Sequence, residues 1–190
     1  QKHKCEYRAM NRFGDYVWLE CRGTMVYDDA RRPKIFAGMM TRLDARNKYD
    51  PLTNLKTFYE FNNLDFSSHS GTVLLIGIDN FRRVINNYGY SSGDVILQEF
   101  CGRLQDYCEG KRYLYRLEGD EFIIVSPGST RGDTEALFAE IQRLGIGLGQ
   151  QRNLLISIEV SGGAVFYPQD GEKRDILITN MEHSLEHAKE

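Results

Sequence analysis

The sequence predicts an α/β protein of the α+β kind, in which a mixed and largely antiparallel sheet is flanked by helices. Apolar runs of strand length alternate with segments whose apolar residues recur at helical spacing. From residue 73 onward these segments follow the order β-α-α-β-β-α-β-α, which is typical of such a fold. Hydrophobic residues make up 41% and charged residues 27% of the 190 positions, so the composition is that of a globular chain.

The beginning of the chain has a β pattern of its own. Apolar and polar residues alternate over residues 6–11, 16–27 and 34–43, and turn residues separate these runs. So few strands leave one apolar face of a sheet without a cover. We therefore expect residues 1–43 to be the C-terminal part of a larger domain, residues 44–50 to be a charged linker, and residues 51–190 to be a second domain.

The second domain is expected to begin with helices around one buried strand. An N-cap at Thr53 predicts a first helix. The apolar run at residues 73–78 predicts a buried strand, and apolar residues within 81–88 form one stripe of a short helix that ends at Gly89. A longer amphipathic helix is expected to open at residues 91–92.

The rest of the second domain is expected to alternate between helix and strand. The pattern predicts a helix over residues 134–144, a strand over 154–166 and an amphipathic helix over 175–189. The glycine-rich run at residues 144–149 follows a helix and not a strand, so it lacks the context of a phosphate-binding loop. We expect this run to be a flexible connector.

Net charge, apolar run length and cysteine content indicate which partners and which cellular location to expect. The net charge of −3 argues against a nucleic-acid partner, since such binders depend on clustered basic residues. No apolar run approaches the roughly 20 residues of a membrane span, so we expect no membrane contact by this segment. The four cysteines form no CxxC pair, which favours reduced thiols and a cytoplasmic location. A parent protein with a membrane anchor elsewhere stays compatible with these observations.

An acidic hairpin is the most informative segment for chemistry. Strands expected over residues 113–117 and 122–125 are joined by a tight turn that carries Glu118, Asp120 and Glu121. Carboxylates at such a tip suit Mg²⁺, which prefers oxygen ligands and completes its shell with phosphates and water. A solvated turn without any ligand is the alternative for an isolated acidic turn of this kind.

Motifs along almost the whole chain resemble the GGDEF domain of the diguanylate cyclase family. Residues 50–55 (DPLTNL) are similar to the DxLTGL motif, and residues 78–94 to the DxDxFK…NDxxGHxxGD segment. Residues 116–122 (RLEGDEF) stand where RxGGDEF stands, so the signature is a degenerate EGDEF. Residues 157–170 resemble the SxGxAxxPxD strand. Upstream, residues 8–44, with Gly14 and Trp18, resemble the last strands of a PAS sensor domain.

The resemblance implies a fold and a reaction. The fold is that of nucleotidyl cyclases and polymerase palms, with a central five-stranded sheet flanked by helices. Two such domains face each other as a homodimer, each with one GTP, and the 3′-hydroxyl of each GTP attacks the α-phosphate of the other. The products are cyclic di-GMP and pyrophosphate, and Mg²⁺ activates the hydroxyl. Many members also carry a cyclic di-GMP phosphodiesterase (EAL) domain downstream, which we expect in a parent protein.

The resemblance assigns roles to five matching residues. Asp120 is implied as a metal-ligand carboxylate, and Glu121 as the group that activates the 3′-hydroxyl and contacts metal. Asp94 stands where the family holds the guanine edge. Arg82 and Lys189 stand where lysines contact the phosphates, so these three residues are the expected GTP-binding positions.

The metal and base positions depart from the family. Besides Asp120, the backbone of Ile78 is an implied Mg²⁺ ligand, but Gly77 replaces the direct carboxylate ligand beside it. Ile85 replaces the asparagine that reads guanine, and leaving that polar edge unpaired costs about 1–3 kcal/mol. Glu118 replaces the first glycine of the signature and brings a negative charge near the phosphates.

Two functions follow from this pattern. The favoured one is a catalytically degenerate GGDEF domain that binds GTP weakly or serves as a regulatory module downstream of a PAS sensor, with Mg²⁺ weakly held or absent. The alternative is an active diguanylate cyclase in which Glu118 supplies the metal ligand that is missing at Gly77.

Overall fold

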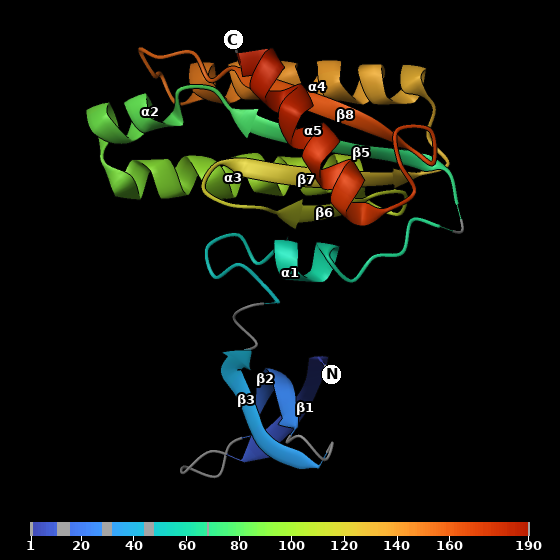
Figure 1. The fold of residues 1–190 in the computed structure, drawn as a ribbon. Helices are drawn as coiled ribbons and strands as arrows, with labels where there is room; N and C mark the ends of the chain where they lie inside the picture. The colour runs from blue at the N-terminus through green and yellow to red at the C-terminus, as the bar shows by residue number, and fades with distance from the viewer. Residues whose placement is uncertain (1, 11–15, 28–31, 44–47, 68, 190) are drawn as a thin grey trace. The chain divides into compact units, whose positions relative to one another are not determined.

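The computed structural model describes residues 2–10, 16–27, 32–43, 48–67 and 69–189 (Figure 1). The chain separates into two compact units, Gln1–Tyr49 and Asp50–Glu190. The expected linker, residues 44–50, lies at this division, although residues 44–47 are outside the described part of the chain.

The first unit contains an antiparallel three-stranded sheet. Its strands are β1 (Lys2–Met10), β2 (Tyr16–Tyr27) and β3 (Pro33–Leu43), in the spatial order β1-β2-β3. The three expected strands are therefore confirmed. Met39 and Met40 are consecutive in β3, and so point to opposite faces of the sheet, yet both are exposed. The assignment of residues 1–43 to a larger domain stays a prediction. The assignment to a PAS domain stays a prediction, and Gly14 lies outside the described residues.

The second unit is built on a five-stranded, mostly antiparallel sheet, as the family resemblance implied. The strand order is β4-β6-β7-β5-β8, and the short β4 pairs parallel to β6 while the other neighbours are antiparallel. The bounds are β4 Lys56–Thr57, β5 Gly71–Ile78, β6 Tyr113–Arg116, β7 Glu121–Pro127 and β8 Val160–Tyr167.

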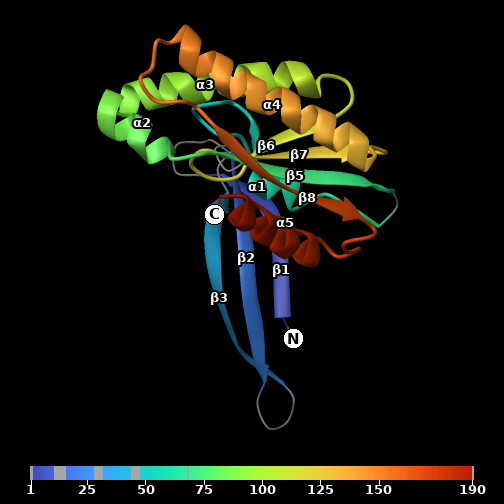
Figure 2. The same ribbon diagram turned by 90° about the horizontal axis from the view of Figure 1, so that it is seen from above.

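Helices cover both faces of this sheet, as Figure 2 shows. None of the helices in the described part of the chain combines the length and apolar character needed to cross a bilayer. Their bounds are α1 Phe58–Phe61, α2 Phe81–Tyr88, α3 Tyr90–Cys108, α4 Arg131–Gln151 and α5 Arg174–Lys189.

Strand β5 separates two hydrophobic cores. All eight of its residues are buried. Leu74 and Ile76 pack with α2, α3 and α4, whereas Val73 and Leu75 pack with α1 and α5. Alternate side chains of a strand point to opposite faces, so a continuous apolar run is what a strand between two helical layers requires.

The expected first helix was placed too early. Thr53 is not an N-cap; its backbone N–H and hydroxyl both donate to Asp50 Oδ1, at 2.8 and 2.6 Å. The helix begins at Phe58 and is preceded by Thr57. Lys56, which lies before this helix, belongs to β4 and pairs with Tyr115 of β6. Such a pairing with a distant segment cannot be predicted from the local pattern.

The glycine-rich run was also misjudged, because it is helical. Helix α4 continues to Gln151, and the strand expected from residue 154 starts only at Val160. Gly145 is the glycine of this run with the closest contact: a Cβ at this position would lie 2.7 Å from the carbonyl oxygen of Ile158. The glycine therefore permits close approach of the helix to the chain entering β8.

Replacing Gly145 by alanine is expected to lower the free energy of unfolding by about 1–3 kcal/mol, since the methyl group would meet backbone. Gly147 is the matched control in the same helix, because a Cβ there meets nothing within 4 Å. Gly147→Ala should raise the free energy of unfolding by about 0.5–1 kcal/mol. Urea denaturation followed by circular dichroism distinguishes the two, and equal effects would contradict this account.

Candidate functional site

The acidic turn predicted from the sequence joins β6 to β7. The Leu117 N–H donates to the Glu121 carbonyl at 2.9 Å, and the Glu121 N–H donates to the Glu118 carbonyl at 2.8 Å. Gly119 has φ of +54°, which favours glycine at this position. Glu118 is exposed and does not have a left-handed backbone, so the turn accommodates a glutamate where the family has its first glycine.

Arg116 holds this turn in place from within the fold. Its Nε and Nη2 donate to the Gly119 carbonyl at 3.2 and 2.6 Å, and its Nη1 donates to Asp50 Oδ1 at 2.6 Å. The arginine is only 9% exposed. In the sequence, Arg116 and Asp50 stand out only as letters of two separate family motifs. The available signal for the pairing of Arg116 with Asp50 was an arginine at the end of a predicted apolar strand, together with an aspartate in a second family motif.

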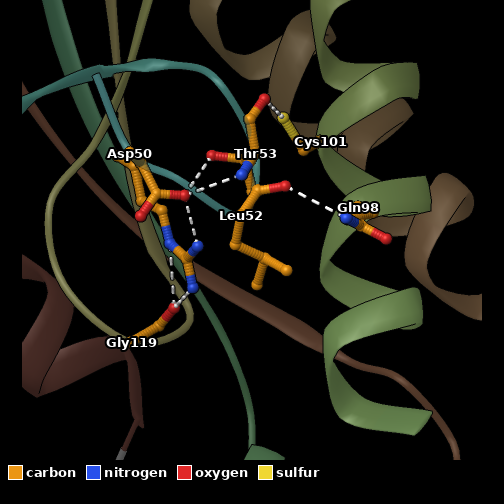
Figure 3. Close-up of polar contacts among 7 residues, drawn as sticks. Asp50, Leu52, Thr53, Gln98, Cys101 and Gly119 are labelled. Atoms are coloured by element: carbon orange, nitrogen blue, oxygen red, sulfur yellow. Dashed lines mark hydrogen bonds and ion pairs between the residues drawn. The ribbon is translucent and has the colours of Figure 1, made fainter. Parts of the chain in front are cut away.

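The Asp50 carboxylate is stabilised in its charged form. Partial burial alone would raise its pKa, but hydrogen bonds from Thr53 and Arg116 and the charge of the arginine together lower the pKa below its usual value. The same segment is tied to α3, because Gln98 Nε2 donates to the Leu52 carbonyl at 3.1 Å. Figure 3 shows the bonds from Thr53 to Asp50 and the bond from Gln98 to Leu52.

The two predicted catalytic carboxylates lie at the end of the central strands. Glu121 is the cross-strand partner of Gly77. The Ile78 N–H faces the Asp120 carbonyl at 3.4 Å, so Asp120 also lies beside the end of β5. Burial raises the pKa of Asp120, and the nearby charge of Lys189 partly opposes this shift. Asp120, Glu121, Gly77, Ile78 and Lys189 are thus brought together.

A Mg²⁺ site of the family kind does not fit the residues present here. Gly77 offers no side-chain ligand, and a Cβ at this position would lie 2.8 Å from Lys189 Nζ. Lys189 Nζ in turn donates to Glu121 Oε1 at 3.1 Å. Over the described ranges, no group of three or more His, Cys, Asp or Glu side chains is arranged to hold a metal ion. The role of exposed Glu118 as a substitute ligand stays a prediction.

The predicted nucleotide-binding residues lie on α2 and α3. Arg82 is exposed on α2, and Asp94 is exposed in the first turns of α3. Ile85 is half-buried and packs against the core formed with α3. A Cβ added to Gly93 would lie 3.2 Å from Ile85 Cγ1, so this apolar side chain borders the residue before Asp94.

Comparison with known proteins identifies the class to which this fold and site belong. The family described as "Diguanylate cyclase, GGDEF domain" matches residues 39–190. The crystal structure of a sensory box/GGDEF family protein from Caulobacter crescentus has a TM-score of 0.61 at 25% identity, covering 75% of this chain and 97% of that one. The chain belongs to the GGDEF domain family.

Two curated relatives are much longer proteins than this chain. The biofilm architecture maintenance protein MbaA of Vibrio cholerae is 30% identical over 166 residues, which is 78% of this chain and 21% of that protein. The bifunctional diguanylate cyclase/cyclic di-GMP phosphodiesterase MucR of Pseudomonas aeruginosa is 29% identical over 118 residues, which is 62% of this chain and 17% of that protein. The chain thus spans about a fifth of the length of each of these relatives. It is a GGDEF signalling domain of the cyclic di-GMP system.

Proposed function

We propose that this GGDEF domain is catalytically degenerate and acts as a regulatory module that binds GTP weakly. The observation that carries the proposal is the apolar contact of Ile85 with the start of α3. A guanine placed against Asp94 meets hydrocarbon at the position where the family offers an amide. One or more of its polar groups is then desolvated without a partner, at a cost of about 1–3 kcal/mol. This weakens both GTP affinity and the choice of guanine over other bases.

The missing carboxylate at Gly77 supports the same conclusion for catalysis. Mg²⁺ requires near-octahedral oxygen coordination, and the loss of one of its protein carboxylates lowers its affinity. In the metal-dependent reaction the ion supplies activation of the attacking hydroxyl and charge stabilisation at phosphate. Because Gly77 supplies no carboxylate, Asp120 and Glu121 lack the third side chain that would help them to bind the ion.

The wider setting is part of the proposal. We place this domain in the cytoplasm, within a homodimer, downstream of a PAS sensor and upstream of an EAL phosphodiesterase domain. MucR, which is described as both a cyclase and a phosphodiesterase, and is much longer than this chain, supports such an arrangement. The domain then transmits a sensor signal to its partners through conformation, and weakly bound GTP adjusts that conformation.

The alternative is an active cyclase with a shifted metal site. The adjacent Asp120 and Glu121, retained at the end of the central strands, favour it. In that case Glu118 completes the metal site, and Glu118→Gly should abolish Mg²⁺-dependent GTP binding. GTP binding that is unchanged in this variant would contradict the alternative.

The test of the proposed function is a titration of the protein with GTP and with ATP, together with a turnover assay in Mg²⁺ and in Mn²⁺. The wild-type protein should bind both nucleotides weakly and form no detectable cyclic di-GMP. Ile85→Asn should raise the affinity for GTP, but not for ATP, by about tenfold, because it restores one hydrogen bond to guanine.

The matched control is Ile85→Leu, which keeps an apolar side chain and should leave both affinities unchanged. Cyclic di-GMP formed by the wild-type protein would overturn the proposal. The proposal would also be overturned if the wild-type protein strongly preferred GTP over ATP and Ile85→Asn did not increase that preference.

A further inference from the structure

We propose that the ammonium group of Lys189 is the resident cation of this site. It stands in front of Asp120 and Glu121, where a metal-dependent site holds its divalent ion, and Gly77 is the residue that makes room for it. The domain therefore keeps its signature carboxylates neutralised with a group from its own last helix.

The space beside Gly77 is filled by Lys189. A Cβ added to Gly77 would lie 2.8 Å from Lys189 Nζ and 3.2 Å from Lys189 Cε. It would also lie 3.4 Å from Glu121 Cγ, so the ammonium group and the glutamate converge on the same point. Any side chain at position 77 and the present position of the ammonium group are mutually exclusive.

The backbone gives no other reason for a glycine at this position. Gly77 lies within the regular strand β5, paired on both sides with Glu121 and Ser161. It is not among the glycines with positive φ, unlike Gly119 in the neighbouring turn. A glycine inside a strand is generally unfavourable, and a close approach by another group is a common reason for it.

The charges around the ammonium group are complementary. Lys189 Nζ donates to Glu121 Oε1 at 3.1 Å, and both side chains are about one-third exposed. Asp120, which is also partly buried, feels the same positive charge. Two carboxylates at adjacent positions repel each other unless a cation lies between or beside them. Lys189 supplies that cation from within the chain.

The end of α5 is fixed so that Lys189 reaches this point. Ser161 Oγ, on the strand next to Gly77, lies 3.3 Å from the carbonyl oxygen of Ala188 and 2.9 Å from Asp79 Oδ2. Leu185, one turn earlier in α5, is buried in the second core. The lysine is therefore positioned by the fold and does not depend on a bound nucleotide.

A divalent ion at these carboxylates has to displace the ammonium group. The test measures Mn²⁺ binding to the nucleotide-free protein by electron paramagnetic resonance, and thermal unfolding with and without Mg²⁺. Wild-type protein should bind Mn²⁺ weakly, and Mg²⁺ should leave its melting temperature unchanged. Lys189→Met should melt at a lower temperature, bind Mn²⁺ at least about tenfold more tightly, and regain stability when Mg²⁺ is added.

Gly77→Ala is the second variant, because its methyl group displaces the ammonium group without changing any charge. It should reproduce the direction of both effects of Lys189→Met. Lys173→Met is the matched control, since Lys173 is exposed in the turn before α5. This control should behave like the wild-type protein.

Two results would overturn the inference. One is wild-type protein that binds Mn²⁺ as tightly as Lys189→Met does. The other is a Lys189→Met protein whose stability and metal binding match those of the Lys173→Met control. No GTP is present in this experiment, so failure of this inference leaves the argument from Ile85 standing, and the nucleotide titration above decides that argument separately.

Discussion

Arg116→Ala is expected to lower the free energy of unfolding by about 3–5 kcal/mol. The substitution removes one partner of a largely buried ion pair, leaves the Gly119 carbonyl without this donor, and leaves the Asp50 carboxylate with only its bonds from Thr53. Urea denaturation of the wild-type and variant proteins at neutral pH measures this loss. We also expect the acidic turn to lose its fixed geometry. Two nitrogens of the Arg116 guanidinium group, Nε and Nη2, donate to the Gly119 carbonyl, and the third, Nη1, donates to Asp50.

The free energy of unfolding that Arg116→Ala removes should become smaller as the pH falls. The folded-state pKa of Asp50 is lowered, so its contribution is present above the unfolded-state pKa of about 3.9 and disappears as the pH falls through the folded-state value. The difference between wild-type and variant proteins should therefore shrink below about pH 4. The control is Arg152→Ala, which breaks the exposed pair with Glu99 and should cost at most about 1 kcal/mol. Equal losses for the two variants would contradict this interpretation.

Gly163→Ala is expected to lower the free energy of unfolding by about 3 kcal/mol, near the upper end for an added methyl group. A Cβ at Gly163 would lie 2.4 Å from the backbone nitrogen of Leu185 and 2.6 Å from the carbonyl carbon of Ser184. Both atoms belong to the backbone of α5, so the whole helix has to move away from β8. Thermal and urea denaturation measure the effect.

The neighbouring residue provides the control for this prediction. A Cβ at Gly162, on the other face of the same strand, would lie 2.5 Å from the ring of Phe138. That ring is a side chain and can rotate, whereas a helix backbone cannot yield locally. Gly162→Ala should therefore cost clearly less than Gly163→Ala. A larger loss for Gly162→Ala would show that the contact between β8 and α5 is not the tighter of the two.

The sequence was sufficient to predict the sheet and most of its helices. The buried strand β5 and the hairpin of β6 and β7 have unmistakable apolar runs, and their pairing was expected from the turn between them. Two errors share one cause. Lys56 joins the sheet, and Gly145 lies inside α4, because of contacts with segments distant in the sequence. Local spacing contains no information about such contacts.

The candidate site was predictable as a set of residues but not as an arrangement. Motif positions indicated Asp120, Glu121 and Lys189, and the structure brings these three together. What the sequence did not show is that the absence of a side chain at Gly77 and the position of Lys189 are one feature. A missing ligand is visible in a sequence, whereas the group that fills the vacated space depends on how a helix packs over 100 residues later in the chain.

The complete burial of β5 has a consequence for how this domain opens. Its backbone amides lie beneath a helical layer on either side and between β7 and β8. Isotope exchange at these amides requires separation of both layers, and so it reports cooperative unfolding of the whole unit. A binding event that loosens only one helical layer therefore leaves the amide exchange rates of β5 unchanged.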